Sequence, residues 1–193
     1  MCDDYGNHVA YAEYAEALQH LQMPILAPTA PPNLEPRDDI WPTEIAPVIR
    51  RFEDGLELAQ LRWGFEPSNP KARVVINFRS EGRSFAKSRR CLVPASHFYE
   101  FRGAKAPKEK WKFTLNGEPW FCFAGLWRKP TGDSPETFTL LTTAPGPDVA
   151  PIHDRQMVVL HPDRWRSWLY LSDPDADLLA PLPAGSLTAE RVR

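Results

Sequence analysis

The residues with the most evident chemistry are a cysteine at position 2 and three polar residues that interrupt apolar stretches. Asn77 follows "VVI", Glu100 closes "HFYE" and His153 lies in "PIHDR". Cysteine oxidises readily, and a chain terminus seldom offers the burial that protects a structural thiol. With Met1 removed, Cys2 carries a thiol and a free α-amine on adjacent carbons, and this pair is a potent nucleophile.

The three polar residues supply what such a nucleophile needs. A carboxylate that follows two aromatic residues is expected to be partly buried, and burial without a partner raises its pKa toward neutrality, where it can accept or donate a proton. Histidine already titrates near neutrality, and an asparagine amide can orient a neighbour. Together with Cys2, these residues form a candidate catalytic set.

Each of these four residues also has a purely structural explanation. Cys2 could be a chance surface cysteine, and Asn77 could end a strand. Glu100 could pair with a nearby arginine or lysine, and His153 could pair with Asp154. Residue by residue, these alternatives stay open.

The remaining cysteines give little sign of chemistry. Cys91 in "RRCLVPA" and Cys122 in "WFCFAGLW" lie in apolar, strand-like runs and are expected to be inert core residues. Three scattered cysteines argue against a disulfide framework and fit a reducing compartment. Because no CxxC or paired-histidine spacing occurs, the sequence predicts neither a metal site nor a cofactor.

Charge is distributed unevenly along the chain, although the net charge is only −2. Residues 1–57 hold three basic and eleven acidic residues, whereas residues 71–112 hold twelve basic and three acidic ones, interleaved with aromatic residues. Cations meet phosphates and aromatic faces accept bases, so this basic segment is typical of a groove for single-stranded nucleic acid. The alternative is a solvated face that the acidic half neutralises after folding.

Length and composition indicate one domain, taken as residues 1–193. No stretch approaches the roughly 20 apolar residues of a membrane helix, and no signal-peptide pattern opens the chain, so we expect a cytoplasmic protein. With 21 prolines, the chain favours short strands and ordered connections over long helices.

The patterning predicts an α+β fold: a mostly antiparallel, barrel-like sheet with short peripheral helices. Turn signals at Asp54-Gly55 and Asn116-Gly117 predict two β-hairpins. Residues 23–42 are too rich in proline for regular structure. Helices are expected within 7–22, 80–90 and 162–170, strands over 72–78, 91–101, 137–143 and 156–160, and a helical turn and a final strand near the C-terminus.

Eight short motifs occur in an order that resembles the SRAP family, the SOS-response-associated peptidase-like proteins. They run from residue 1 to about residue 160 and are "MC", "PT" with "PVI", "LRWGF", "INFRSEG", "RRCLVPASHFYEF", "FAGLW", "LLTTAP" and "PIHDRQMVVL". The resemblance implies a protein of the DNA damage response that binds single-stranded DNA and links covalently, through its processed N-terminal cysteine, to the aldehyde of an abasic site. It implies a monomer, associated with the nucleoid when bound to DNA.

The chemistry implied by the resemblance suits a 1,2-aminothiol. An α-amine has a pKa of roughly 7.7–8, so part of it is neutral and can add to the aldehyde to give an imine. The tethered thiol of Cys2 then closes a five-membered thiazolidine ring with a large effective molarity. Two alternatives are a peptidase with an N-terminal cysteine nucleophile, including removal of its own Met1, and a noncovalent single-strand binding module. Lyase-type strand cleavage is a further activity of this chemistry.

Motif matching assigns roles to individual residues. Glu100 would manage the proton of the amine, His153 would assist opening of the sugar ring, and Asn77 would hold the N-terminal residue. Arg79 and Arg155 match positions that hold phosphates in the family. Arg83 and Pro42 are further candidates for DNA binding, and Trp41 is a candidate stacking face. Phosphate contacts of this kind position a strand without reading its sequence.

The chain departs from the family at its start, where the usual Met-Cys-Gly-Arg is replaced by Met1-Cys2-Asp3-Asp4. Two carboxylates beside the nucleophile are expected to repel a phosphate and to raise the pKa of the amine. The sequence therefore predicts that Asp4→Arg raises the affinity for single-stranded DNA and steepens its salt dependence.

Overall fold

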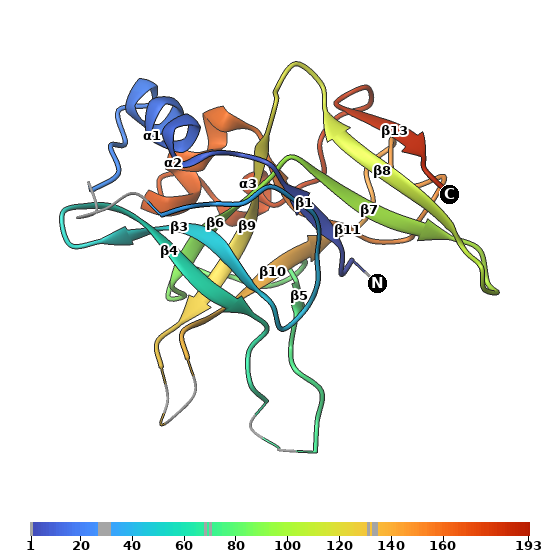
Figure 1. The fold of residues 1–193 in the computed structure, drawn as a ribbon, viewed down its shortest axis with the longest axis horizontal. Helices are drawn as coiled ribbons and strands as arrows, with labels where there is room; N and C mark the ends of the chain where they lie inside the picture. Colours follow the sequence, from blue (N-terminus) through green and yellow to red (C-terminus); the bar gives the residue numbers. More distant parts are fainter. Residues whose placement is uncertain (1, 27–31, 68, 70, 131, 133–134) are drawn as a thin grey trace.

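A computed structural model describes residues 2–26, 32–67, 69, 71–130, 132 and 135–193 (Figure 1). These residues form two sheets and three helices. The first sheet, sheet A, is antiparallel throughout and contains, in spatial order, β13 (Leu187–Arg191), β8 (Glu109–Leu115), β7 (His97–Arg102), β1 (Tyr5–Asn7) and β2 (Arg37–Ile40).

The second sheet, sheet B, is partly ring-like. Because β10 pairs with both β4 and β9, the strands β10, β4, β3, β6 and β9 pair in a closed cycle. The pairings of β10 with β4 and β5 are parallel. Its strands are β3 (Ile45–Phe52), β4 (Gly55–Trp63), β5 (Asn77–Arg79), β6 (Arg90–Ala95), β9 (Phe121–Arg128), β10 (Thr137–Thr143), β11 (Gln156–Met157) and β12 (Val159–Leu160).

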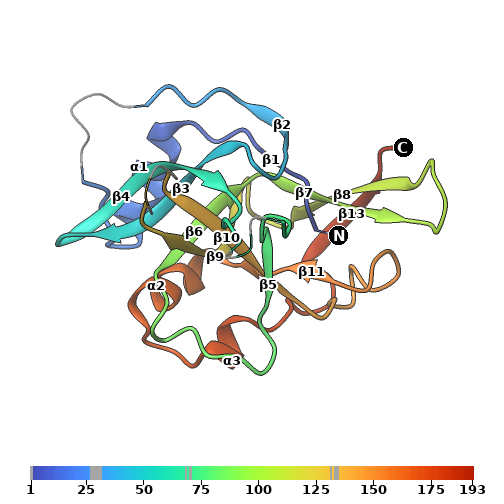
Figure 2. The same ribbon diagram turned by 90° about the horizontal axis from the view of Figure 1, so that it is seen from below.

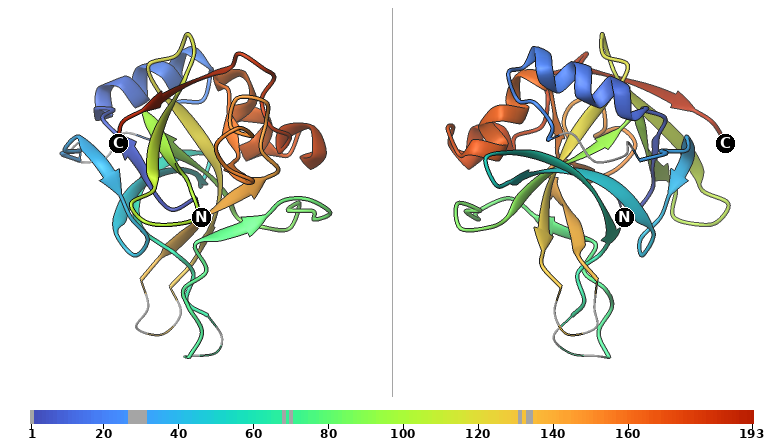
Figure 3. Two further views of the ribbon diagram at one scale, coloured as in Figure 1. Left: turned by 90° about the vertical axis from the view of Figure 1, so that its right-hand side faces the viewer. Right: turned by 60° about the vertical axis from the view of Figure 1, so that its left-hand side comes forward.

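Sheet B is buried on both faces. One face packs against sheet A, where aromatic side chains such as Phe98, Phe113 and Phe123 fill the space between the sheets. The other face packs against α1 (Tyr11–His20), α2 (Pro162–Tyr170) and α3 (Asp175–Leu178), which lie on the outside of the sheet (Figures 2 and 3). Strands buried on both faces read as continuous apolar runs, which explains sequences such as that of β9.

Much of the predicted fold is confirmed. The protein is mostly β-sheet with a few short helices, and sheet B closes on itself in part. The helix expected within 7–22 is α1, the helix over 162–170 is α2, and the turn at Asp54-Gly55 joins the paired strands β3 and β4.

The hairpin predicted at Asn116-Gly117 is wrong. The turn forms, with Gly117 at φ +82°, but its flanking strands belong to different sheets, since β8 pairs in sheet A and β9 in sheet B. An Asn-Gly turn reverses the direction of the chain. Whether the two flanking strands then pair with each other depends on which sheet buries the apolar face of each strand. Here the chain uses the turn to pass from one sheet to the other.

Four other sequence-based assignments need correction. The strand predicted over 91–101 is two strands that separate at Ser96 and enter different sheets. Residues 80–90 form turns instead of a helix, because the Asp175 carboxylate accepts hydrogen bonds from the Phe85 backbone N–H (2.7 Å) and the Arg90 guanidinium (2.5 Å). Only the end of 72–78 is a strand, and 23–42 contains β2, while residues 27–31 lie outside the described part.

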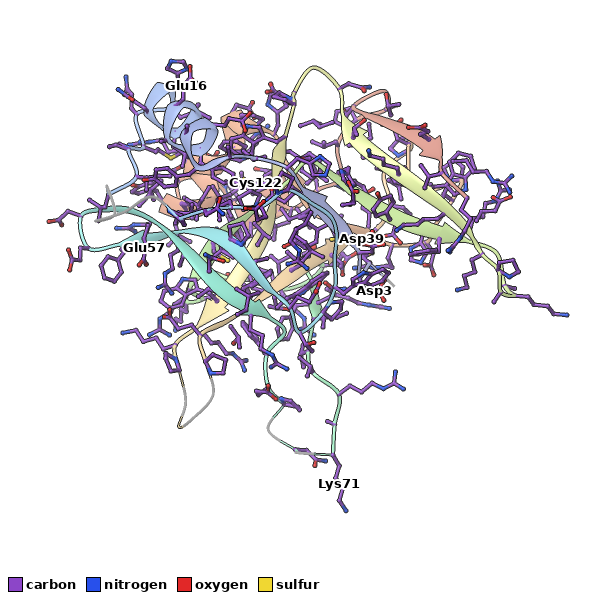
Figure 4. The ribbon with its side chains drawn as sticks, viewed as in Figure 1. Asp3, Glu16, Asp39, Glu57, Lys71 and Cys122 are labelled. Carbon is purple, nitrogen blue, oxygen red and sulfur yellow. The ribbon has the colours of Figure 1, made fainter. Side chains whose placement is uncertain are left out.

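The described residues on either side of the gaps between β4 and β5 extend away from the sheets at one end of the molecule (Figures 1 and 3). Lys71 lies at the outer end of this segment, whereas Cys122 lies among the packed side chains of the interior (Figure 4). In the described part of the chain, none of the helices has the length and apolar character needed to cross a membrane.

Candidate active site

Cys2 is held by the strand that follows it. β1 pairs with β7, Tyr5 opposite Phe98, and with β2 on its other side. The backbone N–H of Tyr99 donates to the Asp4 carbonyl oxygen at 3.0 Å. Cys2 is only 2% exposed and belongs to the core between the two sheets. The alternative of a chance surface cysteine is therefore wrong, because pairing of β1 extends burial to residue 2.

Glu100 lies beside this thiol. Alternation along β7 directs Phe98 and Glu100 to the same side, and Glu100 is fully buried. No hydrogen bond of good geometry reaches either carboxylate oxygen from a described residue. Burial raises the pKa of Glu100 to about 8. The pKa of the Cys2 thiol is raised well above its ordinary value, mainly by burial and to a lesser extent by the nearby Glu100 carboxylate. Both groups therefore hold protons at neutral pH.

His153 completes the cluster from the loop after β10. Its Nδ1 lies 3.4 Å from Glu100 Oε2 and 2.8 Å from the carbonyl oxygen of Arg155. The ligand-type atoms of Cys2, Glu100 and His153 all lie within 4.8 Å of one another. With a proton on Nδ1 the ring donates to the Arg155 carbonyl oxygen, and without one Nδ1 accepts from the Arg155 backbone N–H at 3.2 Å. Either tautomer can therefore stand beside the Glu100 carboxyl, which suits proton transfer between the two groups.

Asn77 fixes the backbone of the nucleophile. It opens β5, which runs parallel to β10 with Asn77 opposite Leu140. The Asn77 Nδ2 donates a 2.7 Å hydrogen bond to the carbonyl oxygen of Cys2. Its Oδ1 is buried and has no hydrogen-bond donor among the described residues. An acceptor is therefore available beside the N-terminal residue.

The same cluster offers ligand types that zinc accepts: a thiol, a carboxylate and an imidazole. Because burial holds protons on Cys2 and Glu100 at neutral pH, a metal ion would have to displace them, and its binding would weaken as pH falls.

The acidic residues after Cys2 are not arranged as the sequence suggested. Asp4 is fully buried, and its Oδ2 lies 2.8 Å from Nζ of Lys110, which also lies 2.6 Å from Asp39 Oδ1 and 3.7 Å from the Tyr99 ring centroid. Burial raises the pKa of Asp4 to about 6, while Lys110 opposes that shift.

The expectation that Asp4 repels a phosphate, and that Asp4→Arg strengthens DNA binding, is therefore corrected. The carboxylate points inward, where an arginine would be buried against Lys110. Lys110 belongs to the basic segment, so the acidic half of the chain neutralises that segment at this position. Nothing in the sequence pairs residues 4, 39 and 110, because Asp4 precedes β1 whereas Asp39 lies in β2 and Lys110 in β8.

The matched arginines differ in their surroundings. Arg79 is exposed on β5, and Arg83 is exposed with its guanidinium 5.9 Å from the Phe78 ring centroid. Arg155 forms a bidentate ion pair with Glu81 and donates to Thr142 Oγ1 at 3.1 Å. Hydrogen bonding from Arg155 lowers the pKa of Glu81 to about 2. Glu81, which lies within the motif "INFRSEG", therefore neutralises the arginine that the motifs assign to a phosphate.

The other two candidate DNA-binding residues lie together at the start of a turn. Trp41 is 42% exposed, with Nζ of Lys110 5.7 Å from its ring centroid, and Pro42 is half-buried. Because Lys110 also contacts Asp4, the indole lies near the N-terminal segment. Figure 4 shows Asp3 and Asp39, two acidic residues of the N-terminal part of the chain, in one region of the view. An exposed indole is a suitable stacking surface for a base.

The protein is a mostly β fold in which a buried cysteine, a buried acid and a half-buried imidazole meet at the N-terminal strand. The sequence matches the family SOS response associated peptidase (SRAP) over residues 1–193, and the chain belongs to this family. It is 30% identical to the abasic site processing protein YoqW of Bacillus subtilis, covering 97% of this chain and 91% of that one. It is 28% identical to the abasic site processing protein YobE of the same organism, covering 97% and 93%.

Solved structures agree with this assignment. The crystal structure of a phage-related protein from Bordetella bronchiseptica superposes with a TM-score of 0.74 at 26% identity, covering all of this chain and 94% of that one. A second Bordetella bronchiseptica structure covers both chains completely, with a TM-score of 0.73 at 25% identity.

Proposed function

We propose that this protein binds abasic sites in single-stranded DNA and forms a covalent thiazolidine crosslink through Cys2 after removal of Met1. The observation that carries the proposal is the placement of the Cys2 thiol beside Glu100 and His153, with its carbonyl held by Asn77. The relatives named abasic site processing proteins support the substrate.

The reaction balances without an added reagent. The abasic sugar opens when its C1′ hydroxyl loses a proton and its ring oxygen gains one, and His153 is placed to move that proton. The amine of Cys2 adds to the aldehyde, and loss of water gives the imine. The thiol then adds to the imine carbon while its proton passes to nitrogen. The product weighs the sum of the reactants minus one water.

Glu100 serves two of these steps because its pKa is near 8. In its neutral form it protonates the departing hydroxyl, and in its ionised form it accepts the thiol proton. Asn77 keeps residue 2 in place for ring closure, which converts a bimolecular addition into an intramolecular one.

An intact-mass experiment tests the proposal. Protein lacking Met1 is incubated with single-stranded DNA that bears one abasic site, and with matched lesion-free DNA. We expect an SDS-stable adduct with abasic DNA alone, mapped to Cys2. Cys2→Ser should give only an imine, which becomes an SDS-stable adduct when borohydride reduces it and hydrolyses otherwise. The absence of any adduct across a range of salt concentrations would refute the covalent mechanism, and equal affinity for both DNAs would favour a noncovalent binding module.

Removal of Met1 by the protein itself is a second candidate function. It is favoured by the Glu100 carboxyl beside the Cys2 thiol, an acid–nucleophile pair suited to acyl transfer. The methionine aminopeptidase of an expression host recognises the first residues of a chain, so a substitution at residue 100 should not affect removal of Met1 by that enzyme. Retention of Met1 in Glu100→Gln, but not in wild type, would establish self-processing, whereas complete removal in both would exclude it. Turnover of a foreign peptide that is lost in Cys2→Ala would indicate a broader peptidase.

A further inference from the structure

A hollow lies on the other side of β5 from the reactive cluster. Adjacent residues of a strand point to opposite faces, so Asn77 faces Cys2 whereas Phe78 belongs to the core on the helix side of sheet B. Beside Phe78 is a cavity of about 590 Å³, which we call the Phe78 groove. This size falls within the roughly 300–1,000 Å³ of ligand-binding pockets.

The rim of the Phe78 groove is cationic. Arg83, Lys87, Arg89 and Arg128 line it, and all four are exposed. None of the four forms an ion pair with a described residue, and no acidic residue lines the groove. Other arginines, such as Arg155, are neutralised by carboxylates. This patch of positive charge is therefore available to a ligand.

The floor of the Phe78 groove is aromatic. The Arg128 guanidinium lies 4.1 Å above the ring centroid of Phe65, and the Phe65 and Phe78 ring centroids are 6.0 Å apart. Phe65 is buried, whereas Phe78 is partly exposed. A cationic rim above aromatic faces matches a strand of nucleic acid, whose phosphates meet the cations while a base stacks on a ring.

We propose that the Phe78 groove is a second subsite for single-stranded DNA, which binds the arm of the strand that leads away from the abasic nucleotide. The inference rests on the proposed function, which places the abasic nucleotide at Cys2. The chain connects the two sites directly, since Asn77 contacts Cys2, Arg79 follows on the same strand, and Arg83 lies on the groove. This segment runs away from the N-terminus in the left panel of Figure 3.

The test uses a triple variant that spares the reactive cluster and Arg83. Lys87→Gln/Arg89→Gln/Arg128→Gln removes three groove cations. The matched control, Arg164→Gln/Arg166→Gln/Arg191→Gln, removes three exposed cations that do not line the groove. Both variants carry the same net charge and are checked for wild-type melting temperature. Affinity is measured with a lesion-free oligothymidine of roughly 20 nucleotides over a series of salt concentrations.

We expect the groove variant to bind this strand at least roughly tenfold more weakly than the control variant at low salt. Its slope of log K against log salt should be about 2 units shallower, because each single-strand phosphate contact contributes ~0.7. Equal affinity and equal slope for the two triple variants would overturn the inference.

Trimming the DNA locates the arm. Abasic oligonucleotides are shortened from the 5′ or the 3′ side, and we expect the difference between groove and control variants to vanish on trimming one side only. If the difference in affinity persists whichever side of the DNA is trimmed, the groove does not bind a defined arm of the strand. With saturating full-length abasic DNA, the groove variant should form as much adduct as wild type.

The two proposals fail in different ways. If wild type forms no adduct but the groove variant alone loses affinity, the covalent mechanism is wrong and the subsite stands. If wild type forms the adduct while the two triple variants bind alike, the subsite is wrong and the covalent mechanism stands.

Discussion

At the scale of single residues, the site depends on a carboxylic acid that the fold keeps neutral. A buried glutamate near a thiol costs free energy when ionised, so the folded protein holds its proton more tightly than the unfolded chain. The same feature that makes Glu100 a proton donor near neutrality thus makes the protein less stable in alkaline solution.

The pH dependence of stability follows from that pKa. The Glu100 carboxyl has a pKa near its ordinary value of 4.5 when unfolded and of about 8 when folded, so its contribution is fully present below 4.5 and is lost as pH rises toward 8. The free energy of unfolding of Glu100→Gln, measured with urea, should therefore rise relative to that of wild type as pH goes from 5 to 9. The expected gain over this range is roughly 1–3 kcal/mol. A constant difference between the two proteins across this range would contradict the assignment. Adduct formation should be slowed in the variant at every pH.

Asn77 allows a second test at the residue scale. Asn77→Ala removes the 2.7 Å hydrogen bond to the Cys2 carbonyl oxygen, and we expect adduct formation to slow by about tenfold, in keeping with the loss of ~1 kcal/mol or more. Noncovalent affinity for lesion-free DNA should stay unchanged, because the side chain orients the protein's own backbone. Asn77→Asp, which cannot donate, serves as the matched variant. A fall in affinity without a fall in rate would assign Asn77 to DNA binding instead.

At the scale of elements, strand pairing decides what local patterns leave open. The sequence predicted the helices α1 and α2 and the β3–β4 hairpin, because each depends on neighbours in the chain. It did not predict the break at Ser96 or the passage at Gly117, because both depend on which sheet buries the next strand.

The link between β1 and β8 gives a prediction at this scale. Lys110→Met leaves the buried Asp4 carboxylate without its cation and should lower the free energy of unfolding by about 3–5 kcal/mol. Urea unfolding measures the loss. Adding Asp4→Asn should recover most of it, whereas adding Asp39→Asn, at an exposed partner, should not. Equal recovery by both would show that Asp4 has no special dependence on Lys110.

At the scale of the whole molecule, four segments far apart in the chain meet at one point. Cys2 precedes β1, Asn77 opens β5, Glu100 lies in β7 and His153 follows β10. Their residue types in the sequence indicated all four as candidate catalytic residues, and the ordered family motifs indicated that they belong to one site. Their contacts could not be predicted from spacing, because two sheets must close before the residues meet. The basic, aromatic-rich segment 71–112 did indicate cations for a nucleic acid, and it holds Lys110 and three of the four cations of the Phe78 groove. The ion pairs of Lys110 and Glu81 and the shape of the groove could not be predicted, for the same reason.

The path of DNA over the surface can be probed at this scale with Arg79, which is exposed beside the reactive cluster. Arg79→Gln should weaken binding of single-stranded DNA equally for all sequences and should reduce the salt slope by ~0.7, the contribution of one phosphate contact. Titrations with oligothymidine and oligoadenosine at several salt concentrations measure both. A loss that differs between the two sequences would mean that Arg79 contacts a base.

The pairing of β1 on both edges has a mechanical consequence. A residue in a frayed tail yields to a small pull, but Cys2 leads directly into a strand that is hydrogen-bonded to β7 on one side and to β2 on the other. Tension on a DNA strand joined to Cys2 would therefore load the interior of sheet A, and the N-terminal segment could be drawn out only by tearing that sheet. The attachment would then withstand force for as long as the protein itself stays folded.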